Sequence, residues 1–197
     1  MTAETLNSFN WIDILMAAIV IRVVYIGIKR GIVVELFKMV GVLSAVFITL
    51  HYFSSISKVL QEKVHLPLAA ADLFSFGILW GLVILAFKFI RDGFGMLFKM
   101  EAAHSILDKW GGLVVCIGRA LLLCSLTILC LRASSIDYFL KNLEKSATAS
   151  KLASLAPGFY EATYNNVVSK FFPSEELNKS AYKLTEFTID AKSEKKK

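Results

Sequence analysis

The amino-acid sequence predicts an all-α integral membrane protein, in which four transmembrane helices are followed by amphipathic C-terminal helices. Three observations carry this prediction. Of the 197 residues, 56% are hydrophobic, which is more than the core of a soluble domain of this size requires. Four apolar stretches are each long enough to cross a hydrocarbon layer of about 30 Å. Beyond Leu131, apolar residues recur at helical spacing between charged ones.

The apolar stretches also set the predicted organisation of the chain. A short polar N-terminus covers residues 1–10, and a four-helix transmembrane domain covers residues 11–131. In chain order, its spans cover about residues 11–28, 32–53, 68–90 and 111–131. Amphipathic surface helices follow over residues 132–173, and a polar, basic tail that we expect to be partly disordered covers residues 174–197.

The first two spans are predicted to form a hairpin. Asn10 offers a helix cap and Trp11 an interfacial aromatic ring at the start of the first span. The apolar run from there is too long for a removable signal peptide, so we expect the segment to be retained. The turn from Gly27 to Gly31 is brief, and this predicts that the first two helices are antiparallel neighbours.

The connections between the later spans differ in character. Residues 54–67 are polar, which predicts an exposed loop that closes with Pro67 near the first turn of the third span. Residues 94–109 mix large apolar side chains with Lys99 and Lys109, and Arg91 lies just before them, a composition typical of a segment lying in the membrane interface.

Two helical patterns follow the last span. Ile136, Phe139, Leu140 and Leu143 have the spacing of one amphipathic helix. A second helix is predicted beyond a break at Pro157-Gly158, ending at Pro173, and residues 191–197 are expected to be a solvated basic tail.

Charge and residue types narrow the possible functions. The formal net charge of +6 comes from Lys and Arg at segment ends and in the tail, which predicts anionic lipid headgroups as partners and no nucleic acid. The cysteines are expected to pack as small groups without forming a disulfide or a metal site. The three histidines are isolated in the sequence, and no known catalytic motif is present, so we predict neither an enzyme nor a cofactor.

The distribution of basic residues predicts an orientation. Lys29 and Arg30 lie between the first two spans, and Lys88, Arg91 and Lys99 lie near the connection between the last two. Because short cytoplasmic loops carry an excess of Lys and Arg, both termini are expected on the non-cytoplasmic side.

The N-terminal half carries a recognisable pattern. Asn10-Trp11-x-Asp13 opens the first apolar helix, Gly27-x-x-x-Gly31-x-x-x-Glu35 leads into the second, and Gly41 follows. This pattern resembles the bacterial colicin V production (CvpA-type) membrane protein family. The later Leu107-Asp108-Lys109-x-Gly111-Gly112 with Gly118-Arg119 is similar to that family's entry into its fourth helix.

The resemblance covers about residues 10–131 and has consequences for function. It implies a four-helix bacterial inner-membrane protein associated with toxin production or export and with envelope tolerance. It does not imply a molecular activity. Arg22 is not part of the family pattern, and residues after Leu131 are variable in the family, so no role carries over to either.

Four carboxylates stand near the starts of the four helices: Asp13, Glu35, Asp72 and Asp108. A carboxylate at a helix N-terminus is stabilised by the free N–H groups and the helix dipole, so capping accounts for all four. A proton relay is the alternative, and it would need a partner at membrane depth.

Two arginines lie within the apolar spans. Counted from the predicted cytoplasmic ends, Arg22 and Arg119 are roughly 9 and 15 Å deep. Helical side chains lean toward the N-terminus, which brings Arg119 toward the cytoplasm and takes Arg22 away from it. We therefore expect Arg22 to need a partner, and Glu35 is the candidate by hypothesis.

Small residues recur along the spans. They predict helix packing at Gly27, Gly31, Gly41, Gly77, Gly81, Gly112 and Gly118. A pore lining is the alternative reading of the stripes on the third and fourth spans.

Two functions from different classes follow from these observations. The first is a non-enzymatic membrane scaffold or accessory for toxin export or envelope homeostasis, with the C-terminal helices as a docking surface. The second is a small oligomeric transporter or channel that uses Arg22 and Arg119 for an anionic solute. Other membrane proteins or further copies of the chain are the expected protein partners.

Overall fold

The fold is a bundle of four long helices, described by a computed structural model over residues 10–29, 31–98, 106–172 and 174–184. The long helices are α2 (Trp11–Ile28), α3 (Gly31–Val64), α4 (Leu68–Phe98) and α5 (Ile106–Ala133). Each contains a stretch that is long and apolar enough to cross a membrane, and the described residues form no strand. The predicted fold class is confirmed.

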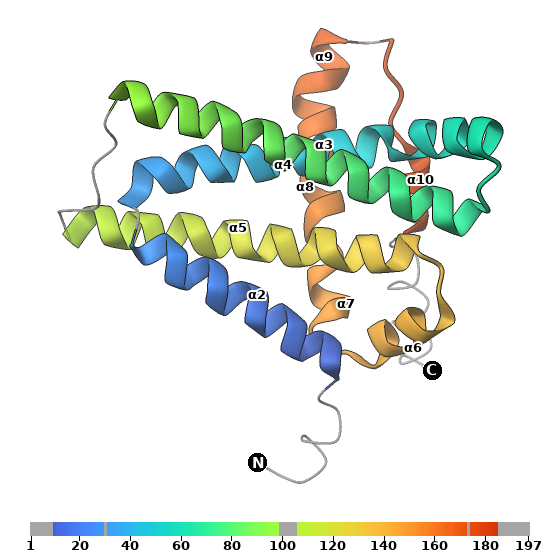
Figure 1. The fold of residues 1–197 in the computed structure, drawn as a ribbon, viewed down its shortest axis with the longest axis horizontal. Helices are drawn as coiled ribbons and strands as arrows, with labels where there is room; N and C mark the ends of the chain where they lie inside the picture. The colour runs from blue at the N-terminus through green and yellow to red at the C-terminus, as the bar shows by residue number, and fades with distance from the viewer. Residues whose placement is uncertain (1–9, 30, 99–105, 173, 185–197) are drawn as a thin grey trace, which may run out of the picture.

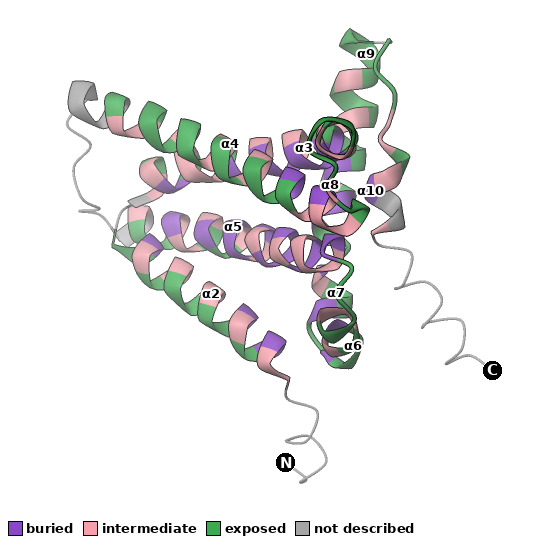
Figure 2. Ribbon diagram, turned by 45° about the vertical axis from the view of Figure 1, so that its right-hand side comes forward, coloured by how far each residue is buried: buried purple, intermediate pink, exposed green. Residues whose placement is uncertain are grey.

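Helix α5 lies at the centre of the bundle. It lies between α2 on one side and the α3–α4 pair on the other, and it carries many of the fully buried side chains (Figures 1 and 2). The outer faces of α2 and α4 are largely exposed (Figure 2). Because apolar surface on these faces suits lipid and not water, this distribution matches a protein embedded in a bilayer.

The short turn between α2 and α3 does not make these two helices close neighbours, contrary to the prediction. Helix α2 packs mainly against α5 and touches α3 only near the turn. At one end Gly27 lies against Cys116, and farther along the thiol of Cys124 reaches the carbonyl of Met16. The turn therefore sets the chain direction, while side-chain fit to α5 selects the packing partner.

The predicted loop over residues 54–67 is also different in the structure. Helix α3 continues without interruption to Val64, and only residues 65–67 separate it from α4. His65 has a φ of 55°, which ends the helix, and the Pro67 carbonyl accepts the Ala71 N–H as α4 begins. The polar residues after Phe53 thus mark where α3 leaves the apolar layer, not where it ends.

The C-terminal helices cross the bundle. They are α6 (Asp137–Lys145), α7 (Ala149–Leu152), α8 (Leu155–Thr163), the π-helical η1 (Tyr164–Val168), α9 (Ser169–Phe171) and α10 (Lys179–Lys183). The column from α7 to α9 runs crosswise to the four long helices and packs on α5 and α3 (Figure 1).

Two predictions for the C-terminal helices have different outcomes. Helix α6 forms as predicted, with Leu143 buried and Phe139 and Leu140 half-buried, but Ile136 precedes the helix as its N-cap and is 46% exposed. Pro157 does not break the second helix, because it lies in the first turn of α8, where its missing N–H costs no intrahelical bond.

Part of the predicted tail is ordered against the bundle. Residues 174–184 include α10, which packs on α3 through the buried Ala181. The expectations for Pro173, for residues 191–197 and for most of the interfacial segment 94–109 lie outside the described residues or side chains.

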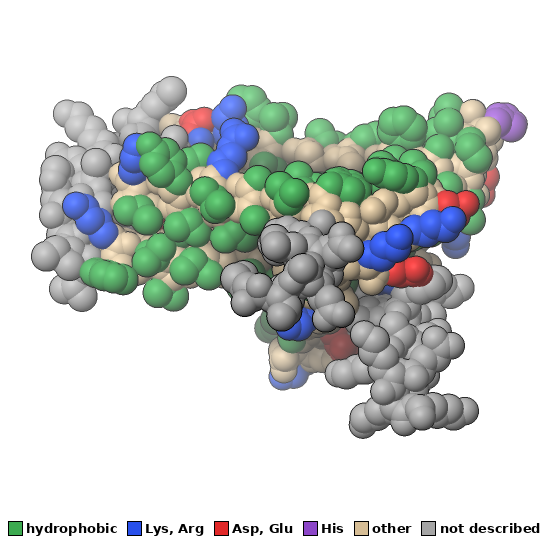
Figure 3. Space-filling model, turned by 90° about the horizontal axis from the view of Figure 1, so that it is seen from below, with side chains coloured by type: hydrophobic (Ala, Val, Ile, Leu, Met, Phe, Trp, Pro, Cys, Tyr) green, Lys and Arg blue, Asp and Glu red, His purple; other side chains and the backbone are tan. Residues whose placement is uncertain are grey.

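Apolar and charged side chains are distributed over the surface as expected for a protein that spans a bilayer. Figure 3 shows hydrophobic side chains over most of the length of the bundle, with Lys and Arg gathered at its left end, where α4 ends and α5 begins in Figure 1. At the other end, Lys and Arg stand beside acidic residues. An apolar band between two charged ends is the pattern of a membrane-spanning bundle.

Candidate functional site

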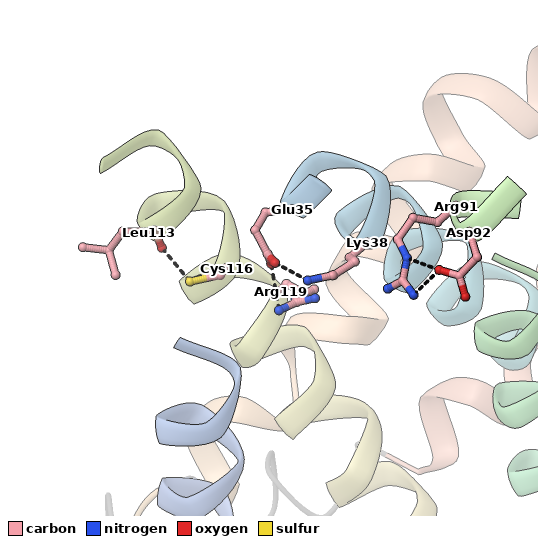
Figure 4. A network of polar contacts seen from close by, with 7 residues as sticks. All are labelled: Glu35, Lys38, Arg91, Asp92, Leu113, Cys116 and Arg119. Atoms are coloured by element: carbon pink, nitrogen blue, oxygen red, sulfur yellow. Dashed lines mark hydrogen bonds and ion pairs between the residues drawn. The ribbon is translucent and has the colours of Figure 1, made fainter. Parts of the chain in front are cut away.

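The most buried charged side chain in the described chain, that of Glu35, belongs to an ion-pair group between α3 and α5. Arg119 Nη2 lies 2.8 Å from Glu35 Oε2, and Lys38 contacts the other oxygen of the same carboxylate (Figure 4). The Glu35 side chain is fully buried, and those of Arg119 and Lys38 are 9% and 12% exposed. A carboxylate in this position would be strongly unfavourable without its cations.

The local sequence explains how Glu35 reaches this position. Glu35 and Lys38 are three residues apart on α3, so both face the same side of the helix. A Cβ at Gly27 would lie 2.6 Å from the Cys116 thiol and 3.6 Å from the Glu35 carboxyl carbon. The absence of a side chain at Gly27 therefore lets the end of α2 close over the ion pair.

The start of α3 is held on α5 by a second contact. Asp108 Oδ1 accepts the backbone N–H of Ile32 at 2.6 Å, which satisfies one of the free donors of α3. Nearby, a Cβ at Gly111 would lie 2.6 Å from Ile32 Cδ1. Asp108 thus caps the neighbouring helix, and this close approach fixes the register between Glu35 and Arg119.

The structure gives Glu35 a different partner from the one we hypothesised. Arg22 is exposed on the outer face of α2, and Arg119 holds the carboxylate in its place. The buried positions of α2 include Met16 and Gly27. At 100° per residue, Arg22 is 600° from Met16 and 500° from Gly27, so it points away from the packed side.

Capping explains fewer of the four carboxylates than expected. Asp13 accepts the Asn10 N–H at 3.2 Å and so caps α2. Glu35 serves the ion pair instead, and Asp108 caps another helix. Asp72 lies half-buried in the second turn of α4.

Asp13 has a further role that the sequence did not reveal. Its Oδ1 accepts hydrogen bonds from Ser146 Oγ at 2.6 Å, from Thr148 Oγ1 at 2.5 Å and from the Thr148 N–H at 3.2 Å. Asp13 is 5% exposed. It therefore ties the start of the first span to the connection between α6 and α7, across more than a hundred residues of sequence.

His51 belongs to a second polar network that the sequence did not reveal. Its Nδ1 lies 2.9 Å from Tyr160 Oη, and its Nε2 lies 3.1 Å from Glu175 Oε2. Tyr160 Oη also accepts the Asn178 N–H at 3.0 Å, so the phenol proton is free to go to His51 Nδ1. With Nδ1 accepting that proton, the ring donates from Nε2 to Glu175.

This network attaches the chain after α9 to the middle of α3. The Asn178 side chain donates to the carbonyls of Leu50 and His51 at 2.7 and 3.1 Å. Tyr160 is fully buried, and burial raises the pKa of its phenol above the usual value, an effect partly offset by the hydrogen bond from the Asn178 N–H. Nothing in the sequence spacing linked His51 with Tyr160, since the fold alone brings them together.

The predicted packing glycines divide into two groups. Gly27 lies close to Cys116, and a Cβ at Gly41 would lie 2.9 Å from Phe87 Cβ. A Cβ at Gly118 would lie 3.6 Å from Met39, Gly112 is buried on α5, and Gly31 is the first residue of α3. Gly77 and Gly81 differ from the expectation, because both are exposed and a Cβ at either would meet open space.

The described part of the chain offers few other groups for metal binding or covalent chemistry. It contains no group of three or more His, Cys, Asp or Glu side chains that could hold a metal ion. Cys116 and Cys124 are buried as free thiols, and Cys130 is half-buried. The ion pair and the two polar networks therefore organise helices, and each joins segments that are distant in sequence.

Comparison with known proteins identifies a family. The family described as "Colicin V production protein" matches residues 12–157, a range that begins at the second residue of α2, includes α3, α4 and α5, and ends in the first turn of α8. No curated protein and no solved structure matches the chain closely.

Proposed function

The chain belongs to the colicin V production protein family, and from this premise we propose that it is a non-enzymatic membrane scaffold or accessory that supports toxin production or export, or envelope homeostasis. It would act in the bacterial inner membrane, with both termini on the non-cytoplasmic side. Other membrane proteins or further copies of the chain would be its partners.

The observation that carries this proposal is the buried attachment of the C-terminal helices to the bundle. Asp13 holds the α6–α7 connection, and His51 with Tyr160 holds α8 and the chain that follows it. The Ser125 hydroxyl adds a third point by accepting the Ala156 N–H at 2.9 Å. Such attachment supports a fixed platform whose outer face is presented in one orientation.

The outer end of that platform is apolar. Val167, Phe171 and Phe172 are 49%, 72% and 62% exposed. They lie in η1 and α9 and the residue after it, at the end of the column farthest from α2 (Figure 1). Exposed apolar side chains on a held element suit the docking of a partner protein.

Complementation tests the proposal. In a strain that lacks the protein, we expect a Val167→Ser, Phe171→Ser variant to lose most of its support for toxin production and envelope tolerance while remaining in the membrane in normal amounts. The matched control is Val59→Ser, because Val59 is 48% exposed and lies on α3, outside the C-terminal helices. Full activity of the double variant would overturn the docking role.

The transporter alternative gains no support from the two arginines. The Arg119 charge is matched by Glu35, and Arg22 lies on the outer face of α2, so the two do not line a common path.

A further inference from the structure

A cavity of about 420 Å³ opens between α3, α4 and α5. Most of its lining is apolar, and its charged lining residues are four cations: Lys38, Lys88, Arg91 and Arg119. Figure 4 shows three of them on three different helices, with Lys38 from α3, Arg91 from α4 and Arg119 from α5. The cavity is thus a mainly apolar space with a cluster of positive charge.

Two carboxylates among the described residues contact three of these cations. Glu35 contacts Lys38 and Arg119, and Asp92 accepts from Arg91 at 2.9 and 2.5 Å. All the charged residues that line the cavity itself are basic. Lys88 is exposed, so its ammonium group can reach a ligand without a change in the core.

Two of the cations are separated from the apolar end of the cavity along α4. Lys88 and Arg91 lie close to the end of the apolar stretch of α4, which runs from Leu68 to Gly93. Trp80 and Gly81 line the cavity about 15 Å deeper along the helix, at 1.5 Å per residue. Lys88 and Arg91 therefore lie nearest the level of the headgroups, and Trp80 and Gly81 lie at the level of the acyl chains.

We propose that this cavity is a binding site for an anionic phospholipid. Its phosphate is held by Lys88 and Arg91, and one acyl chain lies along Gly81 toward Trp80. Gly81 makes room for the chain, because a side chain there would enter open space at the cavity wall. The lipid matches the cavity in charge, in polarity and in the direction of its long axis.

Fluorescence quenching by brominated lipids tests the site directly. The full chain with Trp11→Phe and Trp110→Phe keeps Trp80 as its single tryptophan. In vesicles, we expect brominated phosphatidylglycerol to quench Trp80 at a lower mole fraction than brominated phosphatidylcholine, by about thirtyfold for two interacting cations. Equal quenching by the two lipids would overturn the proposal.

Two pairs of variants identify the site. Lys88→Gln should reduce the preference for phosphatidylglycerol by about fivefold. Lys58→Gln is its control and should leave the preference unchanged, because Lys58 is also exposed but lies near the C-terminal end of α3 and does not line the cavity. Gly81→Leu should block the acyl chain and reduce quenching by both lipids. Gly77→Leu is its matched control, since Gly77 is also exposed to open space but does not line the cavity.

A competition experiment separates a lipid from a soluble anion. Short-chain phosphatidylglycerol should displace the brominated lipid from the Trp80 site, and inorganic phosphate at the same concentration should not. Displacement by phosphate alone would assign the site to a soluble anion and overturn the lipid. Equal loss of quenching in Gly77→Leu and Gly81→Leu would likewise overturn the placement of the chain.

Discussion

Glu35 on α3 and Arg119 on α5 form an ion pair of 2.8 Å in which the carboxylate has no exposed surface. Lys38 shares the same carboxylate. The pair joins the second and fourth spans at the point where the end of α2 closes over them. It is therefore a junction of three helices, and its loss should destabilise the whole bundle.

Removing the charge of Glu35 should destabilise the protein strongly. Glu35→Gln removes the buried carboxylate that Arg119 and Lys38 share, and we expect a loss of about 3–5 kcal/mol in the free energy of unfolding. Denaturation in detergent micelles measures this. Asp92→Asn is the control, because its partnership with Arg91 is half-exposed and should contribute less than about 1 kcal/mol.

A double-mutant cycle checks that the effect belongs to the pair. Arg119→Gln combined with Glu35→Gln should cost less than the sum of the two single changes, because the residues are in direct contact. Strict additivity would contradict a direct interaction.

A methyl group at Gly27 should push α2 away from α5. In Gly27→Ala the new Cβ would lie 2.6 Å from both Cβ and Sγ of Cys116, and we expect a cost of about 1–3 kcal/mol from overpacking. Gly77→Ala meets open space, so the same change should be neutral or stabilising by up to about 1 kcal/mol through helix propensity. Thermal unfolding of both variants in the same detergent gives the comparison. A Gly27→Ala variant as stable as Gly77→Ala would contradict the close approach.

The contrast between these two glycines shows what the sequence could predict. The number of spans and the family pattern follow from apolar length and local motifs, so the four-helix class and the family were predictable. The direction in which each helix face points was not predictable from the sequence. In the sequence, Gly77 and Gly81 indicate helix packing in the same way as Gly27 does. Only the assembled fold shows that Gly27 is at a close contact whereas Gly77 and Gly81 are exposed.

The polar contacts were less predictable for a related reason. Depth along a helix indicated that Arg22 and Arg119 both needed an explanation, but the choice between them depends on rotation about the helix axis. Nothing local to α2 or α3 shows that α2 would pack on α5 with Arg22 outward. The partners of Asp13 and His51 lie more than a hundred residues away in the sequence, where only topology connects them.

Loss of the Tyr160 hydroxyl should loosen the C-terminal helices. Tyr160→Phe leaves the Asn178 N–H and His51 Nδ1 without this partner in a buried site, at a cost of about 1–3 kcal/mol. Limited proteolysis should then cut faster in residues 174–184. Tyr52→Phe is the control, since Tyr52 is 43% exposed, and equal cleavage of the two variants would contradict the network.

The same phenol predicts a response to alkaline pH. Burial raises the pKa of Tyr160 above the usual 10.0, so the folded state keeps the proton after the unfolded state has lost it. The unfolded state is then favoured, and the stability contributed by the neutral phenol, complete below pH 10.0, falls as pH rises from there through the folded pKa. Unfolding measured across this range should show a smaller alkaline loss in Tyr160→Phe. Identical pH profiles would contradict the assignment.

The proposed orientation can be tested with single cysteines at the two ends of the bundle. Lys58 and Lys88 are both exposed, but Lys88 lies at the end where α4 approaches α5, and Lys58 lies on the part of α3 beyond the apolar layer at the opposite end. The excess of Lys and Arg near Lys88 predicts that this end faces the cytoplasm. A membrane-impermeant thiol reagent added to cells with a permeable outer membrane should therefore label Lys58→Cys and leave Lys88→Cys unlabelled until the inner membrane is opened. The unmodified chain supplies the background, because Cys116 and Cys124 are buried and Cys130 is half-buried. Labelling of Lys88→Cys in intact cells, or activity of a cytoplasm-dependent reporter fused after Lys197, would reverse the orientation.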